Sequence, residues 1–185
     1  MRIISGKFKG HHLVSFKADH IRPTTDRVKE TLFNKLMFDL EGARVLDLFC
    51  GTGNLGIEAL SRGAQHVTFV DAHKQSLLIT RENLQKLKVE KNDYSILQKD
   101  VLSYLKGYEG EKFDVIFADP PFTKKMAHDV MLALSSSGGF HSSTLISIES
   151  EKKERLDEQY SPLSRYDVRE FGDKFLSFFK ESSEA

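Results

Sequence analysis

The feature that most constrains the fold is a glycine-rich segment, residues 51–56, between an apolar run and a helical pattern. The run at residues 43–49 has the length and the branched side chains of a buried parallel strand. Leu55, Ile57, Ala59 and Leu60 then follow a helical pattern. Glycines at a strand-to-helix turn let the backbone bend sharply and approach a ligand, because no Cβ intervenes. These residues therefore predict a βα unit whose loop binds a nucleotide-containing cofactor.

Strand and helix patterns alternate along the rest of the chain. Such alternation implies right-handed crossovers and a doubly wound parallel sheet, and the last two strands turn at Gly172 to add an antiparallel hairpin. The sequence therefore predicts an α/β fold with a mostly parallel, seven-stranded, Rossmann-like sheet. The expected strands are 43–49, 66–71, 94–98, 113–119, 143–149, 166–171 and 174–180, and the expected helices are 25–40, 54–62, 74–88, 101–106, 124–135 and a short exposed one within 151–160.

The first residues differ in charge from the rest of the chain. Residues 1–29 carry seven Lys or Arg against two acids, although the net charge of the whole chain is zero. Gly6 and Gly10 flank Lys7-Phe8-Lys9, which predicts a short β-hairpin arm. A local basic face is what contact with phosphates requires, and a merely solvated surface is the alternative. We expect a basic arm at 1–22 and a main domain at 23–185, one domain overall.

The glycine loop is open to two cofactor interpretations. Gly51, Gly53 and Gly56 match the dinucleotide fingerprint, and Asp71 lies 20 residues after Gly51, where that fingerprint expects a ribose-binding acid. A nicotinamide enzyme is therefore one interpretation. Asp47, four residues before the first glycine, disfavours a pyrophosphate because both are negative, but it would attract the ammonium of S-adenosylmethionine. A tight turn without a ligand is a further alternative.

Two further acids follow predicted strands. Asp71 ends the run at 66–71, at the sheet edge where open α/β sheets bind ligands, so it is placed to accept hydrogen bonds from both ribose hydroxyls. Asp100 follows the strand at 94–98 and could accept from the adenine amino group. Each residue could instead cap the helix that comes next.

Asp119-Pro120-Pro121-Phe122 ends the apolar strand at 113–119. An amino group on a base is a poor nucleophile because its lone pair is delocalised. Asp119 and the carbonyl of Pro120 can each accept a hydrogen bond from that nitrogen and turn its lone pair, while Pro121 stiffens the turn and Phe122 offers a stacking face. Together with the glycine loop, this clamp predicts methyl transfer from S-adenosylmethionine to an amino group; an ordinary rigid turn is the alternative.

The residues at 22–34, 47–53, 56–64 and 119–122 together closely resemble the bacterial family that methylates the guanine N2 amino group in small-subunit (16S) ribosomal RNA. The resemblance starts at Met1 and extends to Gly172. It implies S-adenosylmethionine as cofactor and ribosomal RNA, within the small subunit, as partner. The implied catalytic residues are Asp119, Pro120, Pro121 and Phe122, and the expected cofactor contacts are Asp47, Phe49, Gly51, Gly53, Asp71, Ala72 and Asp100. The basic charge of the first residues gives the expected RNA contacts, which are Arg2, Lys7, Lys9, Arg22 and Arg27.

Composition narrows the remaining possibilities. A single cysteine, Cys50, excludes an internal disulfide, and its place in the cofactor loop favours a space-filling role over a nucleophile. No apolar run is long enough to cross a membrane, and His11 and His12 lack the spacing of metal ligands. We expect a cytoplasmic monomer without a metal. Another amino acceptor, such as DNA adenine N6 or a protein glutamine, and a non-catalytic RNA-binding protein are the alternatives.

Overall fold

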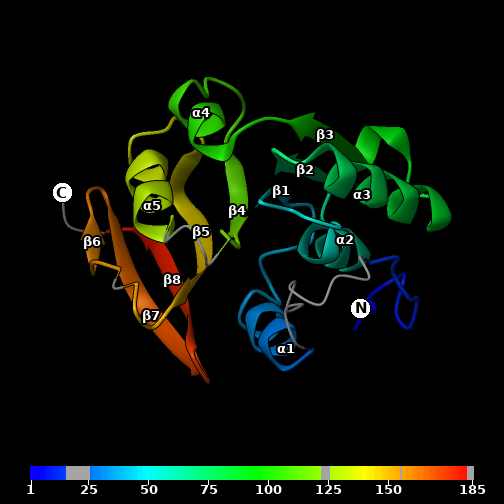
Figure 1. Cartoon of the computed structure of the whole chain (residues 1–185), viewed down its shortest axis with the longest axis horizontal. Helices are drawn as coiled ribbons and strands as arrows, with labels where there is room; N and C mark the ends of the chain where they lie inside the picture. The colour runs from blue at the N-terminus through cyan, green and yellow to red at the C-terminus, as the bar shows by residue number, and fades with distance from the viewer. Residues whose placement is uncertain (16–25, 122–125, 155, 183–185) are drawn as a thin grey trace.

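A computed structural model describes residues 1–15, 26–121, 126–154 and 156–182 and confirms the α/β class (Figure 1). Within these residues a single mixed sheet has the strand order β3-β2-β1-β4-β5-β8-β7-β6. The strands are β1 Arg44–Leu48, β2 His66–Asp71, β3 Tyr94–Gln98, β4 Phe113–Ala118, β5 Phe140–Glu151, β6 Gln159–Tyr160, β7 Leu163–Phe171 and β8 Lys174–Glu181. The helices are α1 Asp26–Lys35, α2 Asn54–Ser61, α3 Lys74–Lys86, α4 Val101–Lys106 and α5 Ala127–Ser135, with a 3-10 turn, η1, at Lys91–Asp93.

The first five strands in sequence are parallel, and the last three are antiparallel to their neighbours. Apolar side chains of α1, α2 and α3 pack on one face of the sheet. Those of α4 and α5 pack on the other face, so the sheet is doubly wound. Strands β1 to β3 are added toward one edge of the sheet, and β4 and β5 toward the other. The order of strands therefore reverses between the parallel neighbours β1 and β4, and their carboxyl ends lie at the point where α/β sheets bind ligands.

The sheet has eight strands rather than the seven expected, because the two-residue strand β6 is added at its edge. The prediction of an exposed helix within 151–160 is wrong. Glu154 is buried there and its Oε1 accepts hydrogen bonds from the backbone N–H groups of Ala127, at 2.7 Å, and His128, at 3.3 Å. Leu156 and Tyr160 are also buried. Tertiary contacts with α5 therefore outweigh the helical bias of this charged segment.

Four helices are shorter than expected: α2 ends at Ser61 and α3 at Lys86, close to the expected bounds, and α1 and α5 differ more. α1 ends at Lys35 rather than at residue 40, although Leu36 and Leu40 remain buried beyond its end. α5 begins at Ala127 rather than at 124, and the residues at 122–125 lie outside the described part of the chain.

The expected N-terminal hairpin is present as one antiparallel bridge between Arg2 and His12, and it is fastened to α2. The Lys7 N–H donates to the Ser61 carbonyl at 2.7 Å. A Cβ at Gly6, where φ is +82°, would lie 1.7 Å from the same carbonyl oxygen, so only glycine permits this close approach. Buried Ile3 anchors the arm to the core below α2. The arm is therefore part of the folded body.

Candidate cofactor and substrate site

The glycine loop joins β1 to α2 through left-handed backbone. Gly51 has φ +55° and Gly53, the N-cap of α2, has φ +81°. The nearest heavy atom to a Cβ at Gly51 would be 3.9 Å away, so this turn has an open side. A Cβ at Gly56 would lie 2.3 Å from the Phe69 ring, so Gly56 lets α2 pack closely on β2. Phe49 has φ +57°, a conformation that few residues other than glycine adopt.

Asp47 lies beneath this loop. Its side chain is 2% exposed, and Oδ2 accepts a hydrogen bond from the Gly56 N–H at 2.8 Å. Burial raises the pKa of Asp47 to about 7; the hydrogen bond from Gly56 opposes this rise and the charge of Asp71 adds to it. A positively charged ligand group at the loop would favour the ionised carboxylate.

Asp71 links the loop to the end of β2. Its Oδ2 accepts from the Gly51 N–H at 2.9 Å, and its Oδ1 accepts from the His73 N–H at 2.8 Å. The N-cap of α3 is His73, without a side-chain cap bond, so Asp71 does not occupy the capping position considered from the sequence. Its carboxylate is held in a fixed orientation beside Gly51, with Ala72 exposed next to it.

Asp100 has the alternative role considered for it from the sequence, which is to cap the next helix. It is the N-cap of α4, and its Oδ1 accepts from the Ser103 N–H at 2.9 Å. The side chain is exposed. The Lys99 N–H donates to the Asp71 carbonyl at 3.1 Å, which keeps the end of β3 beside that of β2. Asp100 therefore lies on the same sheet edge as Asp71, with a capping role in the structure.

The clamp lies directly beside the loop. Leu48 and Ala118 are register partners, and the Asp119 N–H donates to the Leu48 carbonyl at 3.4 Å. Pro120 is buried and Pro121 is exposed. Phe122 lies outside the described residues. The tertiary structure thus brings the two motifs, which are some seventy residues apart in sequence, to adjacent strand ends.

Two side chains of α3 support the loop and were missed in the sequence. Thr80 Oγ1 donates to the Gly51 carbonyl at 2.8 Å, and Asn83 Nδ2 lies 3.0 Å from the carbonyls of both Thr52 and Val14. Both side chains are fully buried. The sequence pattern could have indicated them, because both are polar residues on the same helix face as the apolar Ile79 and Leu84.

Lys29 belongs to the basic run in sequence but cannot reach a phosphate. Its Nζ is buried and lies 2.9 Å from Glu58 Oε2, Asn54 Oδ1 and the Arg2 carbonyl. Burial lowers the pKa of Lys29, and the neighbouring Glu58 opposes this effect. Glu58 also accepts from Ile4 and Ser5 of the arm. This ion pair joins α1, α2 and the arm.

Four of the five predicted RNA contacts lie on the surface. Arg2, Lys7, Lys9 and Arg27 are exposed, while Arg22 lies outside the described residues. Arg2 Nε pairs with Asp26 at 3.1 Å, and Lys7 Nζ lies 4.9 Å from the centre of the Phe8 ring. Cys50, by contrast, is buried, and burial together with Asp47 and Asp71 raises the pKa of its thiol. This environment disfavours the thiolate that a nucleophilic role requires.

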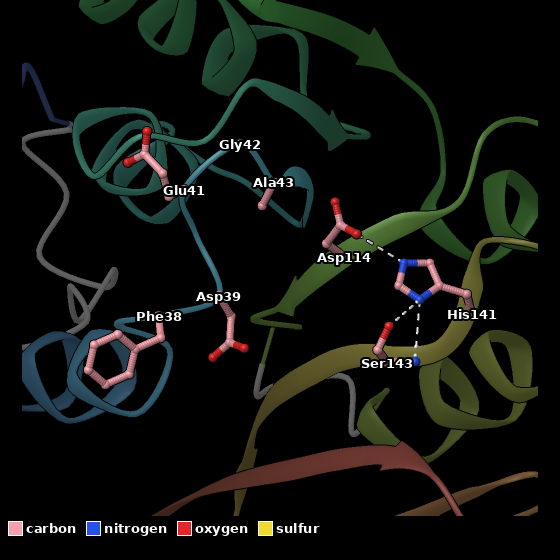
Figure 2. Close-up of a pocket in the computed structure, with 8 residues that line it drawn as sticks. All are labelled: Phe38, Asp39, Glu41, Gly42, Ala43, Asp114, His141 and Ser143. Atoms are coloured by element: carbon pink, nitrogen blue, oxygen red, sulfur yellow. Dashed lines mark hydrogen bonds and ion pairs between the residues drawn. The ribbon is translucent and has the colours of Figure 1, made fainter.

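A pocket of about 300 Å³ lies at the opposite edge of the sheet, where β1, β4 and β5 begin (Figure 2). His141 projects into it, with Nε2 3.0 Å from Asp114 Oδ1 and Nδ1 3.0 Å from Ser143 Oγ. Its lining includes none of the described cofactor or clamp residues. Through the described part of the chain, no helix is long and apolar enough to cross a membrane.

Known proteins are similar to this chain in sequence and in fold. The family model described as conserved hypothetical protein 95 matches residues 1–180. Ribosomal RNA small subunit methyltransferase D of Haemophilus influenzae is 39% identical over 157 residues, which cover 84% of this chain and 81% of the relative. A putative rRNA methyltransferase of Bacillus subtilis is 32% identical, with 98% and 99% covered.

Solved structures are also similar to this chain. A putative methyltransferase from Escherichia coli has a TM-score of 0.87 and 31% identity, covering 100% of this chain and 99% of that one. A putative methylase from Haemophilus influenzae has a TM-score of 0.84 and 32% identity, with 97% of each chain covered. The resemblance drawn from the sequence is confirmed: the chain belongs to the conserved hypothetical protein 95 family, together with the proteins named ribosomal RNA small subunit methyltransferase D.

Proposed function

We propose that the protein transfers a methyl group from S-adenosylmethionine to the exocyclic N2 amino group of a guanine in small-subunit ribosomal RNA. The observation that carries this proposal is the contact between the two motifs, where Asp119 donates its N–H to the Leu48 carbonyl beside the glycine loop. The names of the relatives support ribosomal RNA of the small subunit as the substrate. The N2 position rests on the family resemblance, whose specific segments are the one that begins at Arg22-Pro23-Thr24 and the run at residues 58–64.

The residues at the loop suit S-adenosylmethionine, which supplies an electrophilic methyl group on a positively charged sulfur. Gly51 has an open side where a ligand can approach the backbone closely. Asp71 holds two carboxylate oxygens in a fixed orientation at the end of β2, as acceptors for a ribose diol. Asp47 provides negative charge below the loop, which suits an ammonium group. A solved structure of a putative methyltransferase in complex with S-adenosylhomocysteine shares the fold of this chain at a TM-score of 0.64.

Asp119 and Pro120 would act on the nitrogen nucleophile. The Asp119 carboxylate and the Pro120 carbonyl each accept one hydrogen bond from the amino group, so that the nitrogen lone pair turns towards the methyl carbon. S-adenosylmethionine would supply the methyl carbon to the nitrogen and its sulfur would keep the electron pair of the broken carbon–sulfur bond, while Asp119 or water would take the proton that the nitrogen loses. Most of the acceleration comes from orientation and proximity.

The guanine must leave its stack to reach the clamp. Unstacking costs a few kcal/mol unless the RNA already presents the base splayed out. Pro120 is buried and Pro121, which stiffens the turn, is exposed beside it. The stacking face for the base is assigned to Phe122, as expected from the sequence.

The decisive experiment uses small-subunit ribosomal RNA from cells that lack this protein. The wild type should methylate one guanine at N2 in that RNA, and Asp119→Ala should be slower by about 100-fold or more, because the orientation of the nitrogen is lost. Its affinity for S-adenosylmethionine should stay nearly unchanged. Methylation of DNA adenine or of a glutamine instead would refute the proposed acceptor, and binding of RNA without any cofactor affinity would refute the enzymatic proposal.

Asp71 provides a separate test of the cofactor site. Asp71→Ala removes a charged acceptor worth about 1.5–3 kcal/mol, so the dissociation constant for S-adenosylmethionine should rise by about 10-fold or more in calorimetry. Asp93→Ala is the matched control, since Asp93 lies in η1 before β3, at the other end of the strands. Equal affinities of the Asp71 variant and the wild type would contradict the ribose role, and tight binding of NADH would overturn methyl transfer.

A further inference from the structure

A groove of about 540 Å³ separates α1 from the end of β7. The α1 wall consists of Arg27, Thr31, Asn34 and Lys35, whose spacing places them along one side of the helix. The opposite side of α1 is buried through Val28, Leu32 and Phe33. The other wall is formed by residues 169–171 of β7. A strongly polar helix stripe thus faces the end of a strand.

The strand register places this groove at the same edge of the sheet as the clamp. Ala118 of β4 pairs with Ile148 of β5, so Asp119 lies level with Glu149. Glu149 pairs with Leu176 of β8, and Leu176 pairs with Arg169 of β7. Three strand spacings of about 4.8 Å separate Asp119 from Arg169, roughly 14 Å in total. Figure 1 shows the tip of the β7–β8 hairpin on the side of the sheet where α1 lies.

The groove carries positive charge. Lys35 Nζ and Arg169 Nη2 lie 2.6 Å and 3.1 Å from the same oxygen, Asp167 Oδ2. The hydrogen bond from Lys35 lowers the pKa of Asp167, which therefore remains ionised. Two cations share this one carboxylate, and exposed Arg27 adds a third positive charge. Glu170 is paired with Lys152. The described walls therefore favour an anionic ligand.

Phe171 adds an aromatic surface to this charge. Its side chain is partly exposed and partly packed on the core of the α1 face. Basic side chains that alternate with an aromatic ring are the arrangement with which proteins bind single-stranded nucleic acid, because phosphates pair with the cations and bases stack on the ring. The polar groups of Thr31 and Asn34 lie on the same wall and can bond sugar or base edges.

We propose that this α1–β7 groove binds the single-stranded RNA segment next to the methylated guanine. This inference rests on the proposed function, which requires a base to leave its stack at Asp119. The neighbouring nucleotides then lose their own stacking and pairing, and a surface roughly 14 Å away, at the same sheet edge, can hold them. Arg27, Lys35 and Arg169 bind phosphates, and Phe171 stacks on one base.

The test combines Arg27→Gln with Arg169→Gln. Binding is measured with a fluorescent 12-nucleotide oligouridylate and with unmethylated small-subunit ribosomal RNA, each over a range of salt. The double variant should bind both more weakly, and the slope of log affinity against log salt should be shallower by about 1.4, because two phosphate contacts on a single strand are lost. Methylation should show a raised KM for RNA with kcat nearly unchanged, and cofactor affinity should stay the same.

Two further variants make the result specific. Lys106→Gln with Lys112→Gln removes the same charge from exposed sites at the end of α4 and before β4, so its salt slope should equal that of the wild type. Phe171→Leu keeps apolar packing but removes the ring, and it should weaken binding by about 5-fold or more with the slope unchanged.

The outcomes separate this inference from the proposed function. If the wild type methylates ribosomal RNA while the Arg27 and Arg169 double variant has the same slope and KM, the groove is refuted and the function stands. If the wild type binds oligouridylate through the groove but methylates no ribosomal RNA, the function is refuted, and the groove is a site for single-stranded RNA without a methylated guanine beside it. The proposed role of the groove would also be refuted if the Lys106 and Lys112 control showed the same change in the salt slope. Loss of cofactor affinity in the Arg27 and Arg169 double variant would refute it as well.

Discussion

Replacing Asp47 by asparagine should stabilise the protein above neutral pH and weaken its binding of S-adenosylmethionine. Asp47 is buried, and its pKa is raised from 3.8 to about 7. The folded state therefore binds this proton more tightly than the unfolded state. The stability that comes from the bound proton is fully present below about pH 4 and is lost as the pH rises through about 7.

The magnitude follows from the two pKa values. A tenfold difference in proton affinity corresponds to about 1.4 kcal/mol, so the ionised Asp47 costs the fold about 4 kcal/mol above pH 7. Asparagine carries no charge, and its Oδ1 can still accept the hydrogen bond from Gly56. The difference in free energy of unfolding between Asp47→Asn and the wild type should therefore grow by about 4 kcal/mol between pH 4 and pH 8.

Urea denaturation at a series of pH values measures this difference. A constant offset between the two proteins across the range would refute the reasoning, because it would mean that Asp47 does not titrate differently in the folded state. Calorimetry with S-adenosylmethionine tests the second part of the prediction, that the substitution weakens cofactor binding. Wild-type affinity should fall by up to about tenfold for each pH unit below 7, since the ligand ammonium prefers the ionised carboxylate, and Asp47→Asn should bind weakly with little pH dependence.

Four further predictions concern the loop, the ion pair, the thiol and the arm. Gly56→Ala should lower stability by about 1–3 kcal/mol in thermal unfolding, because its Cβ would overlap the Phe69 ring. Lys29→Met should cost about 3 kcal/mol or more in urea denaturation, because buried Glu58 loses one of its two cationic partners and keeps only Arg62. Cys50→Ala should remain active, and wild-type Cys50 should react with a thiol reagent only on unfolding. Exchanging Lys7 and Lys9 for glutamine should flatten the salt dependence of RNA binding without changing cofactor affinity; an unchanged slope would make the arm purely structural.

The parts of the site that could be predicted from sequence depend on local patterns. The apolar run before Gly51 and the helical pattern after Gly56 specify a βα turn through neighbouring residues alone. Asp71 and Asp119 were predicted at the carboxyl edge because each directly follows an apolar strand pattern. Parallel strands placed by right-handed crossovers bring such ends to one edge, so chain order was sufficient.

Other features depend on partners that are distant in sequence. In the sequence, Lys29 looked like one of several surface cations. Only the structure shows that it is buried and paired with Glu58. The segment at 151–160 reads as a charged helix, yet Glu154 bonds the start of α5 instead. Residues with the same charge or the same helix propensity can be buried in one place and exposed in another, because burial depends on which distant segments pack against them.

The sequence by itself determined the doubly wound sheet, the glycine loop and the order of acids along its edge, because strand period, helix period and turn glycines act over a few residues. Only the tertiary structure decided that Thr80 and Asn83 of α3 support the loop, that Asp100 caps α4, and that Arg169 of β7 lies across a groove from Arg27 of α1. These contacts join segments whose distance in sequence bears no relation to their distance in space, and they form only when strand pairing and helix packing fix the whole chain.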